Sequence, residues 1–338
     1  MTYEAERLNT ESLWYGLYNK GIELGMWDVE SLIDEIGFER DREVWESLDD
    51  DEREQVRRIL AAFLDGEHEV GEDAANHLQR MMGADCLEDN EMKSMYMTVF
   101  TLTEHKHTQF IDLYMKNVVH AGDEDNYAEL APREGSRIPV IEATGLGEVF
   151  DHQALLTTRA AETGDPVDIA KAAANYHLNV EGTLARSGFY AINKMSDVAP
   201  LPLLNRGFKF ISTDEGRHIT HGVRLLNELI EKEEAGEPAY QGVKRGVLDV
   251  LEKDVPRMGE FGYMITDSVG DPLGVGYDDL IMRGGQLIDG TYNESLGLDV
   301  DYMTVISRVR NRFDELEDED VQAKIEEQRR LYERRRAA

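Results

Sequence analysis

The segment Thr101-Leu102-Thr103-Glu104-His105-Lys106-His107-Thr108-Gln109 contains a glutamate and a histidine three residues apart, Glu104 and His107. On a helix, residues three apart share one face and lie about 4.5 Å apart along the axis. A carboxylate and an imidazole in this arrangement can bind one metal ion. The segment from Ser212 to Thr220 repeats the pattern, with Glu215 and His218 at the same spacing.

The two Glu-x-x-His pairs are weak evidence on their own. Acidic residues occupy 69 of the 338 positions, about one in five, and the chain has nine histidines. Roughly two pairs of this spacing are therefore expected by chance, and we interpret Asp65 and His68 as one of them. Further evidence has to come from residues outside the pairs.

A lone glutamate precedes each pair at a similar distance. Glu67 precedes Glu104 by 37 residues, and Glu181 precedes Glu215 by 34, while the two pairs are offset by 111 residues. Two helices that each donate one glutamate, and two that each donate Glu-x-x-His, form the ligand set of ferritin-like dimetal carboxylate proteins. We therefore predict an all-α fold, a ferritin-like four-helix bundle with additional flanking helices. The predicted ligands are Glu67, Glu104, His107, Glu181, Glu215 and His218. Four carboxylates and two imidazoles suit a pair of iron or manganese ions.

Apolar residues recur at helical spacing around each predicted ligand. The predicted helices begin after Asp50 and include Glu67, extend from about Met95 to Leu113, cover Ile169 to Asn193, and continue from Glu215 to Ile230. Residues 149–163 and 240–265 are also predicted to be helical. Residues 1–50 are interpreted as a polar lead-in with aromatic anchors at Trp14, Tyr15, Trp27 and Trp45. Other segments are predicted to be irregular: a break over 83–90, connections over 122–146 and 199–207, and a partly extended or coiled stretch over 268–298. We expect one domain over 1–338, with a ligand-bearing core at about 50–235 and a C-terminal helical extension at about 236–338.

The charge balance excludes one class of function. Thirty-six Lys and Arg residues against 69 acids give a net charge of −33, and general nucleic-acid binding needs clustered cations. We interpret the acids as a solvated surface of the kind expected in a halophilic protein. Cys86 is the only cysteine, so an intrachain disulfide is impossible and a reducing interior is expected. The sequence has no signal-peptide core and no uncharged run approaching 18 residues, so we expect a cytoplasmic protein without a membrane span.

The acidic surface predicts that stability depends on salt. Unscreened self-repulsion destabilises the compact state, and the screening length falls from about 30 Å at 0.01 M to about 3 Å at 1 M salt. The melting temperature should therefore rise markedly with sodium or potassium chloride over this range. A melting temperature that does not change with salt would show that the acids are compensated locally.

Four motifs resemble the ribonucleotide reductase small-subunit superfamily, and more narrowly its ligand-binding oxidase branch. They are Gly66-Glu67-x-x-Val70, Glu104-His105-Lys106-His107-Thr108-Gln109, Tyr176-His177-x-x-Val180-Glu181-Gly182 and Asp214-Glu215-x-x-His218. The resemblance implies an oxidase that uses dioxygen at a manganese/iron or di-iron centre and holds a long-chain fatty acid or similar apolar ligand between its helices. It also implies a covalent link between Tyr176 and Val70, and an Asp214 that orients a metal-binding histidine. We further expect a homodimer.

Several assignments have alternatives. Asp65, Glu69 and Glu72 compete with Glu67 as the first ligand. His177 is predicted to lie on the helix surface or beside a ligand, and His221 not to contact metal. Tyr176 and Asp214 have the simpler interpretations of core packing and acidic surface.

The predicted function also has two alternatives. A reductase small subunit would usually carry its radical tyrosine four residues after the first histidine ligand, where this chain has Ile111. An iron-storage or purely structural ferritin-like protein would not need Val70 and Tyr176, or a chain this long.

Overall fold

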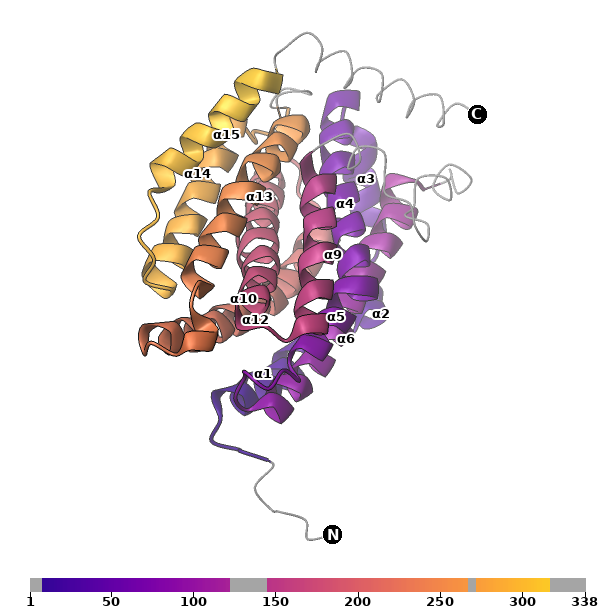
Figure 1. Cartoon of the computed structure of the whole chain (residues 1–338). Coiled ribbons are helices and arrows are strands. Elements are labelled where there is room, and N and C mark those ends of the chain that lie inside the picture. The colour runs from indigo at the N-terminus through magenta and orange to yellow at the C-terminus, as the bar shows by residue number, and fades with distance from the viewer. Residues whose placement is uncertain (1–7, 122–144, 267–271, 317–338) are drawn as a thin grey trace.

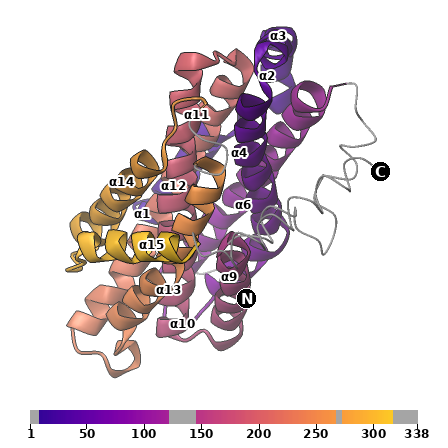
Figure 2. The ribbon, with the colours of Figure 1, turned by 90° about the horizontal axis from the view of Figure 1, so that it is seen from above.

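A computed structural model describes residues 8–121, 145–266 and 272–316 of the chain (Figures 1 and 2). These residues form helices and connecting turns with no β-strand, which confirms the all-α prediction. Four helical segments make the central bundle: α4 (Asp50–Glu69), α6 (Asn90–Tyr114), the π-helical η3 (Ala174–Ala185) and α12 (Pro202–Glu234). The segment η3 continues α10 (Pro166–Ala173) and runs directly into α11 (Arg186–Val198).

The remaining helices flank this bundle. They are α1 (Leu13–Gly25), α2 (Val29–Ile36), α3 (Glu39–Ser47), η1 (Val70–Ala74), α5 (Ala75–Met81), η2 (Met115–Val119), α9 (Gly145–Thr163), η4 (Pro238–Tyr240), α13 (Val243–Thr266), α14 (Tyr277–Ile288), η5 (Asp289–Ser295) and α15 (Tyr302–Leu316). Seen from above, α14 and α15 lie on one side of the bundle, and α2 and α3 lie on the other (Figure 2).

Local sequence explains where the helices begin. Asp49 and Glu52 form a reciprocal capping box at the start of α4, in which each side chain accepts a hydrogen bond from the other residue's backbone N–H. Asp165 caps α10 in front of Pro166, a residue suited to the first helical position. The predicted helices over the ligands and over residues 149–163 and 240–265 are confirmed, as is the break at 83–90. The predicted connection at 122–146 lies outside the described residues up to 144, and α9 already begins at Gly145.

The prediction of extended or coiled structure within residues 268–298 was wrong over residues 277–295. This stretch contains α14 and η5, although its glycines favour coil. A Cβ atom at Gly285 would lie only 2.7 Å from Ile306 Cδ1 of α15, so glycine is what allows α14 to pack closely on α15. Leu280, Ile281 and Ile288 of α14 are buried. Tertiary packing therefore outweighs the weak local propensity.

The polar lead-in at residues 1–50 contains helices for which no prediction was made, because its described part forms α1, α2 and α3. Each of these helices buries one apolar face, for example with Trp14, Leu32 and Trp45. The connection predicted at 199–207 is shorter than expected. Its Pro202 is the first residue of α12, a position where the missing N–H of proline costs nothing.

The start of α12 is capped from a distant part of the chain. Leu201 makes no side-chain cap. Instead, the fully buried Asp41 of α3 accepts hydrogen bonds from the backbone N–H groups of Leu203 and Leu204, both at 3.1 Å, and from the Tyr114 hydroxyl at 3.0 Å. A carboxylate at a helix N-terminus satisfies orphan N–H donors and complements the helix dipole. Asp41 thus anchors α12 to the N-terminal helices.

Replacing Asp41 with alanine should lower the free energy of unfolding by about 2–3 kcal/mol, because two N–H donors and a buried hydroxyl lose their charged acceptor. Chemical denaturation of both proteins at the same salt concentration measures the change. Asp34→Ala is the control, since Asp34 is an exposed aspartate on α2 and its loss should change stability by less than about 0.5 kcal/mol. Equal stability of the two variants would contradict the capping role.

Helices η3 and α12 cross at contact distance. A Cβ atom at Gly222 of α12 would lie 2.1 Å from the Cβ atom of His177. Only a residue without a side chain allows this approach. The close crossing places the face of η3 that carries Glu181 next to the face of α12 that carries Glu215.

Candidate metal centre

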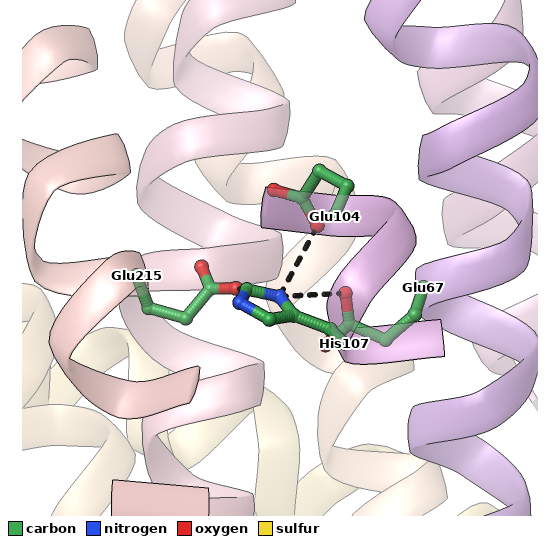
Figure 3. A group of neighbouring side chains, drawn as sticks. All are labelled: Glu67, Glu104, His107 and Glu215. Atoms are coloured by element: carbon green, nitrogen blue, oxygen red, sulfur yellow. Dashed lines mark hydrogen bonds and ion pairs between the residues drawn. The ribbon is translucent and has the colours of Figure 1, made fainter. Parts of the chain in front are cut away.

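The bundle brings all six predicted ligands into one buried cluster. Two groups of side chains each place one ligand atom per residue within 4.8 Å of one another. The first group is Glu67, Glu104, His107 and Glu215, and the second is Glu104, Glu181, Glu215 and His218. Glu67 comes from α4, Glu104 and His107 from α6, and Glu215 from α12, with their side chains directed toward one another (Figure 3). Glu104 and Glu215 belong to both groups, which is the position of carboxylates able to bridge two ions.

His107 faces the first group through one ring nitrogen. Its Nδ1 lies 3.3 Å from Glu67 Oε2, 3.5 Å from Glu215 Oε1 and 3.6 Å from Glu104 Oε2. Its other nitrogen, Nε2, lies 3.1 Å from Asp214 Oδ2. A carboxylate can only accept a hydrogen bond here, so Nε2 carries the proton and Nδ1 presents its lone pair to the cluster when the ring is neutral.

Asp214 is itself held in place on the far side of His107. Its Oδ2 also accepts a hydrogen bond from Trp27 Nε1 at 2.8 Å, and its Oδ1 pairs with the Arg217 guanidinium. The Asp214 side chain is completely buried. A histidine ligand whose second nitrogen donates to a fixed carboxylate keeps its tautomer and ring orientation. The arrangement is therefore suited to orienting His107.

His218 has the equivalent support from a hydroxyl group. Its Nδ1 lies 2.8 Å from Glu104 Oε1 and 3.2 Å from Glu181 Oε1, and its Nε2 lies 3.1 Å from Thr103 Oγ1. The Thr103 hydroxyl donates its proton to the Phe100 carbonyl at 2.8 Å. Its oxygen is then left to accept from Nε2–H, and Nδ1 of a neutral ring presents its lone pair to the cluster.

The cluster fits a pair of cations better than it fits a hydrogen-bond network. Glu181 Oε1, Glu215 Oε2 and His218 Nδ1 are buried, and none of them makes a well-aligned hydrogen bond within the described part of the chain, although His218 Nδ1 lies 2.8 Å from Glu104 Oε1. Unpaired buried polar atoms are costly. Here they converge on the same space with carboxylate and imidazole chemistry, which is the donor set preferred by iron and manganese.

Protons compensate part of the negative charge when no metal is bound. Burial raises the pKa of Glu67 well above its ordinary value, and burial with the nearby Glu181 and Glu104 raises the pKa of Glu215 to about 7. Burial opposes protonation of His107, but Glu67 and Glu104 outweigh it and raise its pKa to about 10. Metal binding must displace such protons.

The competing assignments for the first ligand separate clearly. Glu67 belongs to the first group, whereas Asp65 and Glu69 belong to neither group although they lie on the same helix. The side chain of Glu72 lies outside the described residues.

His177 and His221 are both fully buried, so the surface position considered for His177 was wrong. His177 Nδ1 lies 2.8 Å from Glu181 Oε2, while the His221 ring contacts those of Trp14 and Tyr96. Neither histidine belongs to the two metal-binding groups.

Trp27 and Thr103 were not identified from the sequence. The sequence carries no signal for Trp27, because Trp27 meets Asp214 across 187 residues. For His177, the four-residue spacing from Glu181 was a sequence signal that the two side chains lie next to each other on one helix face.

An apolar cavity of about 140 Å³ opens beside the cluster. Its lining includes the four glutamates of the cluster together with residues of α13, α14 and α15; the glutamates are Glu67, Glu104, Glu181 and Glu215. Val70 and Tyr176 both line this cavity. The Tyr176 hydroxyl donates to Glu104 Oε1 at 3.3 Å, and burial raises its pKa well above the ordinary value, so the phenol keeps its proton.

Among the described residues, every helix is too short or too polar to cross a bilayer.

Comparison with known proteins adds a family and a fold. Residues 32–254, about two thirds of the chain, match the family of ribonucleotide reductase small chains. Among solved structures, the chain is similar to an R2-like ligand-binding oxidase from Sulfolobus acidocaldarius, with 20% sequence identity, a TM-score of 0.67, and coverage of 88% of this chain and 95% of that one. A variant R2-like ligand-binding oxidase with an anaerobically reconstituted Mn/Fe cofactor matches with 21% identity, a TM-score of 0.68, and coverage of 86% and 95%. These likenesses support the ferritin-like bundle expected from the ligand spacing.

Proposed function

The chain belongs to the ribonucleotide reductase small-chain family, and from this premise we propose that it is a dimetal oxidase that activates dioxygen. The observation that carries the proposal is the pair of buried groups that share Glu104 and Glu215 and open onto an apolar cavity. We propose Glu67, Glu104, His107, Glu181, Glu215 and His218 as the metal ligands, with Glu104 and Glu215 bridging.

The metal pair is proposed to be manganese and iron, or two irons. Similar solved structures carry a Mn/Fe cofactor, and the donor set suits both ions. When bound, such a pair would supply the reduction of dioxygen and the oxidising power that follows from it. The protein's own contribution is positional: Asp214 and Thr103 fix the two histidine rings, and burial excludes water from the carboxylates.

The second part of the proposal is an apolar ligand, with a long-chain fatty acid as the expected type. The cavity supports it, because apolar side chains such as Phe63, Val180 and Met258 line it together with the glutamates. Its volume of about 140 Å³ is close to that of an engineered cavity of about 150 Å³ that holds one benzene molecule. A long acyl chain would therefore have to displace lining side chains.

We also propose that Tyr176 and Val70 become joined by an ether link. Their common position on the cavity wall next to the ligand carboxylates supports this step. The phenol O–H and the valine Cβ–H each lose one hydrogen, an O–C bond forms, and dioxygen takes up the two electrons and two protons.

A single domain is likewise proposed, because α13, α14 and α15 line the same cavity as the ligand glutamates.

Metal loading under anaerobic conditions tests the oxidase proposal. The protein should bind two ions per chain and consume dioxygen when exposed to air without any partner protein. An iron-storage protein would instead accumulate many ions per chain. Failure to bind two ions, or binding without dioxygen consumption, would contradict the proposal.

A reductase small subunit remains the second candidate, because the family match carries that name. Ile111 is fully buried and stands one helical turn after His107, where the usual radical tyrosine would be expected. This candidate requires that the metal-loaded chain stimulate nucleotide reduction by a large catalytic subunit. The oxidase proposal requires that it does not.

A further inference from the structure

A second hollow lies between α11, α12, α14 and η5, and none of its lining residues also lines the apolar cavity. It encloses about 460 Å³. Arg186, the first residue of α11, and Arg224 of α12 supply its charges, while Gln286 of α14 contributes an amide. Ile219, Val223 and Leu287 form an apolar wall.

The charge of this hollow is opposite to that of the whole chain. Acids occupy 69 of 338 positions, so about two acids would be expected among 11 lining residues. The hollow has none and contains two arginines. Within the described residues, neither Arg186 nor Arg224 forms an ion pair or a hydrogen bond, and both side chains are exposed. Their N–H donors are therefore available to an anion from solution.

The hydrogen-bond donors of the hollow lead to the same conclusion. The hydroxyls of Thr220, Thr291 and Ser295 already donate to backbone carbonyls of their own helices at 2.7–2.8 Å. The Asn227 amide donates to the Ser295 carbonyl at 3.2 Å. The uncommitted side-chain donors are therefore the two guanidinium groups, the Gln286 amide N–H₂ and the second N–H of the Asn227 amide.

A neighbouring cation increases the need for an anion. Partial burial lowers the pKa of the Arg186 guanidinium, and the neighbouring Arg283 lowers it further. The Arg283 side chain donates to Gln286 Oε1 at 3.5 Å, so the amide oxygen of Gln286 already has a partner. Like charges without a counter-ion repel each other, and a bound anion would remove this cost.

We propose that this hollow binds a small organic anion, with an oxyanion head between Arg186 and Arg224 and a short apolar body against Ile219, Val223 and Leu287. Guanidinium groups suit carboxylate and phosphate heads because their planar donors match these oxygens in pairs. The apolar wall distinguishes such a ligand from an inorganic ion. None of the lining residues belongs to the metal-binding groups, although the Arg186 guanidinium lies close enough to Glu215 to interact with its charge.

Calorimetric titration of the metal-loaded protein tests the proposal with two probes, butyl phosphate and inorganic phosphate, at constant ionic strength and constant chloride. Butyl phosphate should bind once per chain and more tightly than inorganic phosphate. Arg186→Gln and Arg224→Gln should each weaken it about tenfold or more, since each removes a charge-assisted pair of hydrogen bonds. Arg206→Gln is the matched control on α12, because Arg206 stacks on Phe210 away from the hollow, and it should bind like the wild type.

Three results would overturn the proposal. They are no binding of butyl phosphate, equal binding by the wild type and the Arg186→Gln/Arg224→Gln double variant, and equal affinity for the two probes. Circular dichroism and metal content of each variant verify that the fold and the metal centre are intact. Both arginines are exposed on the helix surface, so these controls should match the wild type.

Discussion

Glu104→Ala and Glu215→Ala should each reduce bound metal from two ions per chain to about none, while the helical content remains that of the wild type. Both carboxylates belong to the two metal-binding groups at once, so each substitution removes a donor from both ions. Loss of one shared donor also leaves each group with less negative charge to balance a divalent cation. Metal analysis after anaerobic loading and desalting measures the occupancy, and circular dichroism measures the fold.

The fold of Glu215→Ala is expected to survive because this carboxylate opposes burial rather than assisting it. The pKa of Glu215 is raised to about 7 by burial and by the neighbouring glutamates, so its ionised form is disfavoured in the metal-free protein. For Glu104, burial opposes ionisation, but the His218 and His107 rings outweigh it and hold its pKa well below the ordinary value.

Glu91→Ala on α6 and Glu231→Ala on α12 are matched controls, since both glutamates are exposed on the same helices. They should retain two ions. Full occupancy in both cluster variants would refute the assignment of the bridging ligands.

Air exposure of the protein loaded with reduced metal should convert Val70 and Tyr176 into a linked pair. The link joins positions on η1 and η3 that are 106 residues apart in sequence, so it should survive complete denaturation. Peptide mass spectrometry should find the two peptides joined, with the mass of two hydrogen atoms missing. Protein kept without dioxygen should give the two peptides separately.

Tyr176→Phe is the control for this reaction. Its ring keeps the packing of the tyrosine against Phe100 but has no oxygen with which to form the ether. The variant should bind two ions, consume dioxygen and yield no linked peptide. If the wild type also yields only separate peptides after full metal loading and air exposure, the cross-link is refuted and the dimetal bundle remains.

Sequence spacing was sufficient for the parts of the site that lie on single helices. Helix geometry alone places residues three apart on one face, and this is the spacing of Glu104 and His107 and of Glu215 and His218. The pairing of Glu67 with the second helix could also be anticipated from the parallel order of the two halves. The supporting residues differ in this respect, because Trp27 and Asp214 meet only through the docking of α1 and α2 against α12, which no local pattern encodes.

The same distinction applies to the fold. Glycines and aspartates over 268–298 indicate coil when only local propensity is considered, yet Gly285 serves close packing between α14 and α15. The helices before Asp50 were missed because they are short, and the charges of α3 obscure the apolar face that Val44 and Trp45 bury. In both regions the deciding contacts are made with distant helices.

The hydrogen bond from Trp27 to Asp214 gives the protein an intrinsic optical reporter. The chain has three tryptophans, and the indole of Trp27 is joined through one carboxylate to His107, over which it lies nearly parallel at a ring distance of 6.5 Å. Iron and manganese quench nearby indole fluorescence, whereas Trp45 stacks with Arg57 away from the cluster. Fluorescence emission should therefore decrease as metal is added and stop decreasing at two ions per chain. Most of this decrease should be lost in Trp27→Phe, so that light emission alone would follow the filling of the centre in solution.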